Sequence, residues 1–107
     1  MAVISFENKV YAYESINTTN SAVGLSSNYI TTGREDYFHI GAVITVEGHS
    51  VRIRLDGTDP TTSEGHLVDV GDVIVLYGED VLSSFKAISS DGTTTATLKV
   101  SYFKWLE

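Results

Sequence analysis

Short stretches of alternating apolar and polar residues run through this chain of 107 residues. In residues 51–56, VRIRLD, every second residue is apolar and the residues between are charged, as in a strand that buries one of its faces. Residues 9–14, 40–47 and 96–103 show the same two-residue period. Residues 73–77 are apolar on both faces, which predicts a central or doubly covered strand. No window carries sustained helical spacing, so the pattern predicts an all-β protein.

Turn-forming residues separate the expected strands. The sequence EGHS at Glu47–Ser50 predicts a turn that pairs the strands on either side of it as a hairpin. Residues 78–80 lead into an expected strand over residues 81–88, and Asp91-Gly92 leads into the last strand. Loops are expected at residues 15–20, 33–36 and 58–71, and a short strand at residues 22–25.

About seven short strands at roughly ten-residue spacing predict a β-sandwich or, as the alternative, a small barrel. We expect a single β-sandwich of immunoglobulin-like or fibronectin-like type over residues 1–107. The pattern is strongest over residues 40–105 and weak over residues 1–38, which are expected to form an arm or an edge region. A chain of this length buries enough surface to fold without disulfides.

The segment Asp56-Gly57-Thr58-Asp59-Pro60 is the densest turn signal in the chain. Glycine adopts a positive φ at little cost, proline has a fixed φ, and aspartate side chains accept hydrogen bonds from nearby backbone amides. These five residues are therefore expected to be a structural turn with Gly57 at positive φ. None of them supplies a reactive group that catalysis would need.

Composition and charge narrow the classes of function. The formal net charge is −7, which argues against a phosphate-binding surface and therefore against nucleic acid as a partner. The chain has no cysteine, so disulfides and thiolate metal sites are excluded. Residues 1–7 lack the regions of a signal peptide, and no apolar run approaches the ~18 residues that cross a bilayer. We therefore expect a protein that is made in soluble form and has no membrane partner.

Acidic residues gather at Asp56, Asp59, Glu64, Asp69 and Asp72. A calcium site needs about six to eight oxygens that converge on one point, and the spacing of these acids shows no such register. We interpret them as turn caps and solvated side chains, with a weak metal site as the alternative.

The other residues that could bind a metal or take part in catalysis lie far apart in the sequence. His39, His49 and His66 lie in three separate segments, without the short spacing of metal ligands. The chain contains neither a G-x-S-x-G nucleophile elbow nor a glycine-rich phosphate loop. The sequence therefore predicts no catalytic residue, no metal and no cofactor, and a protein that is not an enzyme.

Aromatic residues are the best candidates for a binding surface. Tyr102 shares its strand face with apolar residues and is expected in the core. Phe103 and Trp105 fall on the polar face of the same strand, and Tyr11 and Tyr13 share one face of the first strand. Large outward aromatics are enriched at interfaces, so these four residues are candidate contacts with another protein or a stacking platform for sugars. The alternative is that sheet or register changes near the termini bury them.

One ordered series of motifs carries a resemblance to a known family. It consists of Ala42–Glu47, Arg52–Thr61, Gly65–Leu67, Gly71-Asp72, Leu76, Phe85–Ile88 and Leu98–Phe103. Over residues 42–103 the chain thus resembles a family of small virion proteins of tailed bacteriophages. Turns like the DGTDPT sequence also occur in fibronectin-type or immunoglobulin-like modules of carbohydrate-active enzymes.

The resemblance implies a non-enzymatic virion protein, located in the virion and assembled in the host cytoplasm. Its expected partners are the major capsid protein or other virion proteins, and it is expected to form homo-oligomers. A capsid decoration or cement subunit is the leading function. Head-to-tail joining, a place in the tail and a carbohydrate-binding accessory module are the alternatives.

Overall fold

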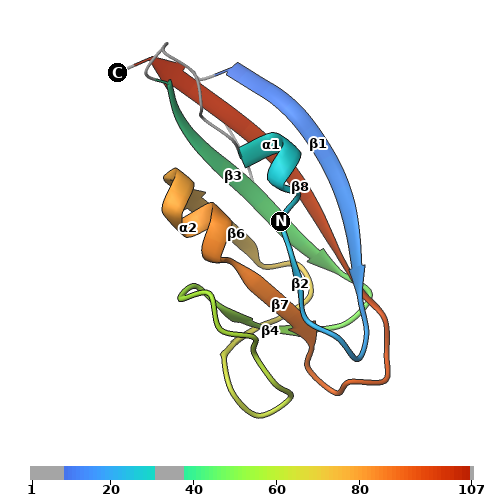
Figure 1. Ribbon diagram of the computed structural model, residues 1–107. Coiled ribbons are helices and arrows are strands. Elements are labelled where there is room, and N and C mark those ends of the chain that lie inside the picture. The colour runs from blue at the N-terminus through green and yellow to red at the C-terminus, as the bar shows by residue number, and fades with distance from the viewer. Residues whose placement is uncertain (1–8, 31–37, 107) are drawn as a thin grey trace.

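A computed structural model describes residues 9–30 and 38–106, which form two four-stranded antiparallel sheets and two short helices (Figure 1). Sheet A contains, in spatial order, β1 (Lys9–Thr18), β8 (Ala96–Leu106), β3 (Phe38–Glu47) and β6 (Val73–Tyr77). Sheet B contains β2 (Val23–Gly24), β7 (Lys86–Ser89), β4 (Val51–Arg54) and β5 (His66–Val68). The helices are α1 (Ser27–Ile30) and α2 (Glu79–Ser84). The predicted all-β sandwich is confirmed, with eight strands instead of about seven.

The core lies between the two sheets and is built from the expected alternation. The side chains that sheet A contributes from its two central strands are Ile40, Ala42, Ile44, Val46, Ala96, Leu98, Val100 and Tyr102. Sheet B contributes Val51, Ile53, Val68 and Ala87, and α2 with the residue after it adds Leu82 and Phe85. These side chains are between 0% and 9% exposed. Burial of this apolar area is the main stabilising term of the fold.

The turn at residues 47–50 does not make the expected hairpin. The two strands that flank it, β3 and β4, belong to different sheets, so the turn carries the chain from sheet A to sheet B. β3 is already hydrogen-bonded on both sides, to β8 and to β6. A third strand has no place beside it, and β4 pairs with β5 and β7 instead.

The prediction that residues 73–77 form a central strand is wrong. In the described part of the chain, β6 pairs only with β3 and lies at the edge of sheet A. Leu76 faces the core, whereas Val75 and Tyr77 are 41% and 58% exposed. The apolar outward face of this strand is therefore partly exposed at Val75 and Tyr77.

A strand was expected over residues 81–88, but its first half is helical. α2 follows Gly78, which has a φ of 102°. Glu79 and Asp80 lie in the first turn, where negative charge is favoured by the helix dipole. Leu82 and Phe85 are fully buried on one side of the helix, and Phe85 returns to an extended backbone that continues as β7.

The expected structural turn after β4 is present. Gly57 has a φ of 85°, as predicted. Asp56 accepts a hydrogen bond from the Thr58 amide at 3.2 Å and forms an ion pair with Arg54 at 2.6 Å. Pro60 is buried. The connection that follows was expected to be all loop, but it contains the short strand β5.

Candidate interaction surface

A bulge in β1 separates the two tyrosines of this strand. The register of β1 against β8 shifts between Val10 and Ala12, which adds one residue to β1 at Tyr11. Tyr11 packs against the core, whereas Tyr13 is 58% exposed. The prediction that Tyr11 and Tyr13 share one face is therefore wrong, because an extra residue inverts the alternation of side chains. Only Tyr13 remains as a surface candidate.

Tyr11 and Tyr102 take part in a partly buried polar cluster. The Tyr11 hydroxyl donates to the Tyr29 carbonyl, and the Tyr102 hydroxyl donates to Oε2 of Glu14. The same carboxylate oxygen accepts the Ser26 amide at 3.1 Å. Burial raises the pKa of both tyrosines, and the hydrogen bond to Glu14 raises the pKa of Tyr102 further. The predicted core position of Tyr102 is confirmed, and Tyr11 also serves packing.

Phe103 points away from the core and is nevertheless fully buried. Its neighbour Tyr102 faces the core, so Phe103 lies on the outer face of sheet A, as the alternation predicted. Gly41, opposite it on β3, makes room for the ring, because a Cβ there would come within 2.5 Å of the Phe103 ring. The Tyr77 ring meets Phe103 edge-on at 5.9 Å. Of the two interpretations, the alternative of burial therefore holds for Phe103 in the single chain.

Two rows of paired residues cross the outer face of sheet A from one edge to the other. The first row is Val10, Phe103, Gly41 and Tyr77, and the second is Tyr13, Ser101, Val43 and Val75. We call these residues the outer band. Its centre is buried, since Phe103 is 0% and Val43 5% exposed. Its ends on β1 and β6 are between 41% and 58% exposed, so the band opens to solvent at both edges of the sheet.

The fourth aromatic candidate, Trp105, lies in β8 opposite His39 of β3. Its side chain is outside the part of the chain that the structure describes. Its role as an interface residue therefore stays a prediction.

Charge is distributed unevenly over the two edges of sheet A. Residues 55–85 contain seven acidic residues and no lysine or arginine, and this segment includes β5, β6 and α2. At the opposite edge, Lys9 of β1 pairs with Lys104 of β8. Of these acids, Asp72, Glu79 and Asp80 lie next to the ends of β6, so the β6 edge is acidic, and the start of the β1 edge is basic.

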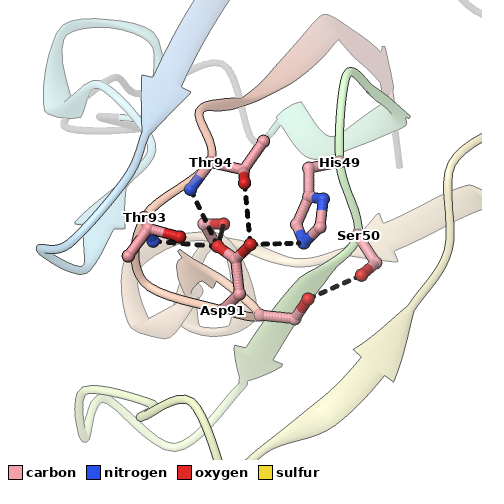
Figure 2. A network of polar contacts seen from close by, with 7 residues as sticks. His49, Ser50, Asp91, Thr93 and Thr94 are labelled. Carbon is pink, nitrogen blue, oxygen red and sulfur yellow. Dashed lines mark hydrogen bonds and ion pairs between the residues drawn. The ribbon is translucent and has the colours of Figure 1, made fainter.

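The densest polar network joins the two turns that cross between the sheets at one end of the sandwich (Figure 2). Asp91 accepts hydrogen bonds from the backbone amides of Thr93 and Thr94, both at 2.8 Å, and from the Thr94 hydroxyl at 2.7 Å. His49 approaches the same carboxylate at 3.4 Å. The backbone amides of Thr94 and Thr93, followed by the Thr94 hydroxyl, hold the pKa of Asp91 well below its usual range. Asp91 therefore caps the turn that leads into β8.

This network has the composition of a Ser-His-Asp set but not its geometry. The Ser89 hydroxyl donates to Asp91 at 3.2 Å, and the Ser50 and Ser90 hydroxyls bond to each other at 2.6 Å. In a catalytic triad the serine bonds to the histidine, and the aspartate orients that histidine from its other side. Here histidine and serine meet on one carboxylate, so the arrangement stabilises a turn.

An open groove lies beside the structural turn, lined by Arg54, Leu55, Asp56, Glu64, Gly65 and His66. The guanidinium of Arg54 is bound to Asp56 through two contacts, at 3.1 Å and 2.6 Å. This mutual pairing raises the pKa of Arg54 and lowers that of Asp56. The charged groups of the groove are thus directed at each other.

Residues 9–30 and 38–106 contain no cluster of three or more histidine, aspartate or glutamate side chains that could hold a metal ion. The acids from Asp56 to Asp72 are therefore not gathered around one point. Across the same residues, neither helix has the length and apolar character to span a membrane.

Comparisons with known proteins returned no relative. No family model matches the chain, and neither a curated protein nor a solved structure matches it. The resemblance to phage virion proteins thus stays a prediction from the motifs of residues 42–103. The structure contributes the sandwich fold and the geometry of the outer band.

Proposed function

We propose that this protein is a non-enzymatic structural subunit of a bacteriophage virion, which decorates or cements the capsid by binding the shell of the major capsid protein. The motifs of residues 42–103 point to the virion. The observation that carries a protein-binding role is the outer band, an apolar surface on a rigid sheet with exposed ends at Val10, Tyr13, Val75 and Tyr77.

The physics of the outer band suits binding to another folded protein. Tyrosine combines a large apolar ring with a hydroxyl, and aromatic residues are enriched in protein interfaces. The side chains at the centre of the band are held in place by burial, so little conformational entropy is lost when a partner covers its ends. A capsid repeats the same site many times, which multiplies modest contacts if the subunits also bind one another.

The charge of the protein supports the same role. With a net charge of −7 and acidic residues at both ends of β6, the protein is repelled by nucleic acid and attracted by basic patches. An acidic subunit therefore remains on a basic patch of the shell without binding the phage genome.

The test is co-sedimentation of the purified protein with capsids assembled without it. We expect binding that saturates at a fixed ratio to capsid subunits. Tyr77→Ser should weaken this binding, whereas Leu67→Ser should not. The two residues are similarly exposed, at 58% and 53%, but Leu67 lies on sheet B.

Protein that remains in the supernatant at every concentration would contradict the capsid role. It would favour head-to-tail joining or a place in the tail. A saturable change of tryptophan fluorescence with an oligosaccharide would instead favour a carbohydrate-binding module.

A further inference from the structure

The β6 edge of sheet A lacks the features that usually protect an edge strand. Natural edge strands carry lysine, proline, a bulge or an inward charge that prevents pairing with another strand. β6 has the sequence VIVLY, with no charge and no proline, and its register with β3 is regular from Val73 to Tyr77. In the described part of the chain, β3 is its only neighbour.

The hydrogen-bond pattern shows which residues of β6 face the open edge. The Gly78 amide donates to the Ile40 carbonyl of β3 at 2.8 Å. Residues along an antiparallel strand direct their backbone groups alternately to one side and to the other. Gly78 and Leu76 therefore bond to β3, whereas the backbone groups of Val75 and Val73 point away from it.

The same reasoning extends across the sheet to β1. Val43, opposite Val75, directs its backbone groups away from β6 and towards β8. Ser101, its partner on β8, bonds back to β3. Tyr13, opposite Ser101, therefore directs its backbone groups away from β8 to the open edge. Ser15, two residues further along β1, does the same.

The two edges fit each other in direction and in hydrogen bonding. Sheet A has four strands, each antiparallel to its neighbour, so β1 and β6 run in opposite directions. A second copy that continues the sheet thus places its β1 antiparallel to β6. In this arrangement Tyr13 of the second copy and Val75 form a hydrogen-bonded pair, because the backbone groups of both point to the new contact.

The side chains fit in the same register. Continuing the two rows of the outer band places Tyr13 of the second copy beside Val75, and its Val10 beside Tyr77. These four are the exposed ends of the band, between 41% and 58% exposed in the single chain. One contact would cover all of them and make the band continuous from copy to copy.

Charge selects the same register. Lys9, Lys104, Ile40 and Gly78 lie in one row across sheet A. Lys9 of the second copy thus comes beside Gly78, next to Glu79 and Asp80 at the end of β6. A contact between opposite charges adds specificity and an on-rate that falls with salt.

We propose that the protein self-associates head to tail, with the β1 edge of one copy added to the β6 edge of the next, so that sheet A continues through the assembly. Such a contact is heterologous and leaves a pair of copies with one free β1 edge and one free β6 edge, so it builds rings or chains. It requires only a second copy of this chain. It covers the same ends of the outer band that the proposed capsid contact uses, so the two roles are tested by separate measurements.

The alternative is a two-fold contact of β6 with itself. Antiparallel pairing centred on Val75 would bring Asp72 of one copy beside Gly78 of the other and close to Glu79. Like charges would then meet at both ends of the contact, and the assembly would stop at a dimer. The charge distribution favours the pairing of β6 with β1.

The experiment is analytical ultracentrifugation of the full chain and of two edge variants. Val75→Lys blocks the β6 edge, and Tyr13→Lys blocks the β1 edge. We expect the wild-type protein to form species larger than a dimer that dissociate as the salt concentration rises. Each variant alone should be a monomer. An equimolar mixture should form a one-to-one dimer, because it still offers one intact edge of each kind.

Val70→Lys is the matched control, since Val70 is 55% exposed in the connection before β6 and the substitution adds the same charge. It should associate like the wild-type protein, and all variants should retain the wild-type Tm. A monomeric wild-type protein, self-association of Tyr13→Lys, a mixture that stays monomeric or a monomeric Val70→Lys would each overturn the proposal. Capsid binding is measured separately, so it can fail or succeed independently.

Discussion

The two faces of sheet A use apolar side chains for different purposes. On the inner face, Leu98, Val100 and Tyr102 are all 0% exposed and belong to the core between the two sheets. On the outer face, among the side chains that the structure describes, Phe103 and Val43 are buried at the centre of the outer band, and Val75 and Tyr77 remain exposed at its edge. The inner face therefore stabilises the fold, whereas the exposed ends of the outer face are available for binding.

This difference follows from what covers the two faces. The inner face is covered by other parts of the same chain, so its whole apolar area contributes to the free energy of unfolding. At the ends of the outer band, apolar area stays in contact with water in the single chain. Removing such a side chain changes the stability little and changes an interface more.

The largest effect is expected from a truncation on the inner face. Leu98→Ala should lower the free energy of unfolding by about 2–5 kcal/mol, because it removes buried contacts and leaves a cavity. Urea denaturation measures this loss. Val75→Ala is the matched change on the outer face and should stay within about 0.5 kcal/mol of the wild-type protein. Equal losses in the two variants would remove the distinction between the faces.

A substitution at Gly41 tests the centre of the outer band, where side chains are buried as they are in the core. Gly41→Ala should lower the free energy of unfolding by about 1–3 kcal/mol, because the new methyl group overpacks the site. Its Cβ would lie 2.5 Å from the Phe103 ring and 2.7 Å from the Leu76 carbonyl oxygen.

A second change separates these two clashes. Phe103→Leu in the Gly41→Ala background should recover only part of the loss, because the contact with the Leu76 carbonyl remains. Wild-type stability of Gly41→Ala in urea denaturation would show that the ring does not occupy this space.

The inner face and the structural turn could be predicted from the sequence because their conformations restrict the residue types. The inner face requires an apolar residue at every second position, and the turn requires glycine at its positive φ. Burial on a single face enforces the two-residue period of residues 98–102, and the structure shows it there. At Gly57 a φ of 85° favours glycine, so the residue type identified the turn.

The outer face could be predicted only in part, because its burial depends on residues far away in the chain. Phe103 is covered because Gly41 on another strand leaves space for it, and no local pattern around residue 103 records this. The bulge at Tyr11 likewise depends on the pairing of β1 with β8. The turn at residues 47–50 is equally suited to a hairpin and to a crossing between sheets. It forms the crossing because β3 is paired with β6 on one side and with β8 on the other.

The turn that leads into β8 belongs to neither face of sheet A. Its contribution to the stability of the fold should depend on pH. The lowered pKa of Asp91 means that its carboxylate stabilises the fold at pH values above the usual aspartate pKa of ~3.9. This stabilisation is lost as the pH falls from there towards the lowered pKa of the folded protein. Asp91→Asn should therefore lower the Tm at neutral pH, and the difference from the wild-type protein should shrink below about pH 4.

Asp59→Asn is the control for Asp91, since Asp59 is an exposed acid in the structural turn. It should leave the Tm almost unchanged across the same pH range. Thermal denaturation followed by circular dichroism gives both curves. A Tm difference for Asp91→Asn that stays constant down to acidic pH would show that the charge of this carboxylate does not stabilise the turn.

The smallest effect on stability is expected at Tyr13, where the comparison between the faces is sharpest. Tyr13 is 58% exposed, so Tyr13→Ser should change the free energy of unfolding by no more than about 0.5 kcal/mol. The same change removes the largest side chain at the β1 end of the outer band and should weaken self-association in sedimentation velocity. Tyr11→Phe, two residues away in β1 but directed at the core, should lower the stability and leave self-association unchanged, because it removes the hydroxyl bonded to Tyr29 and leaves the edge intact. If Tyr13→Ser instead lowered the stability and left the association unchanged, the outer face of β1 would belong to the fold and not to an interface.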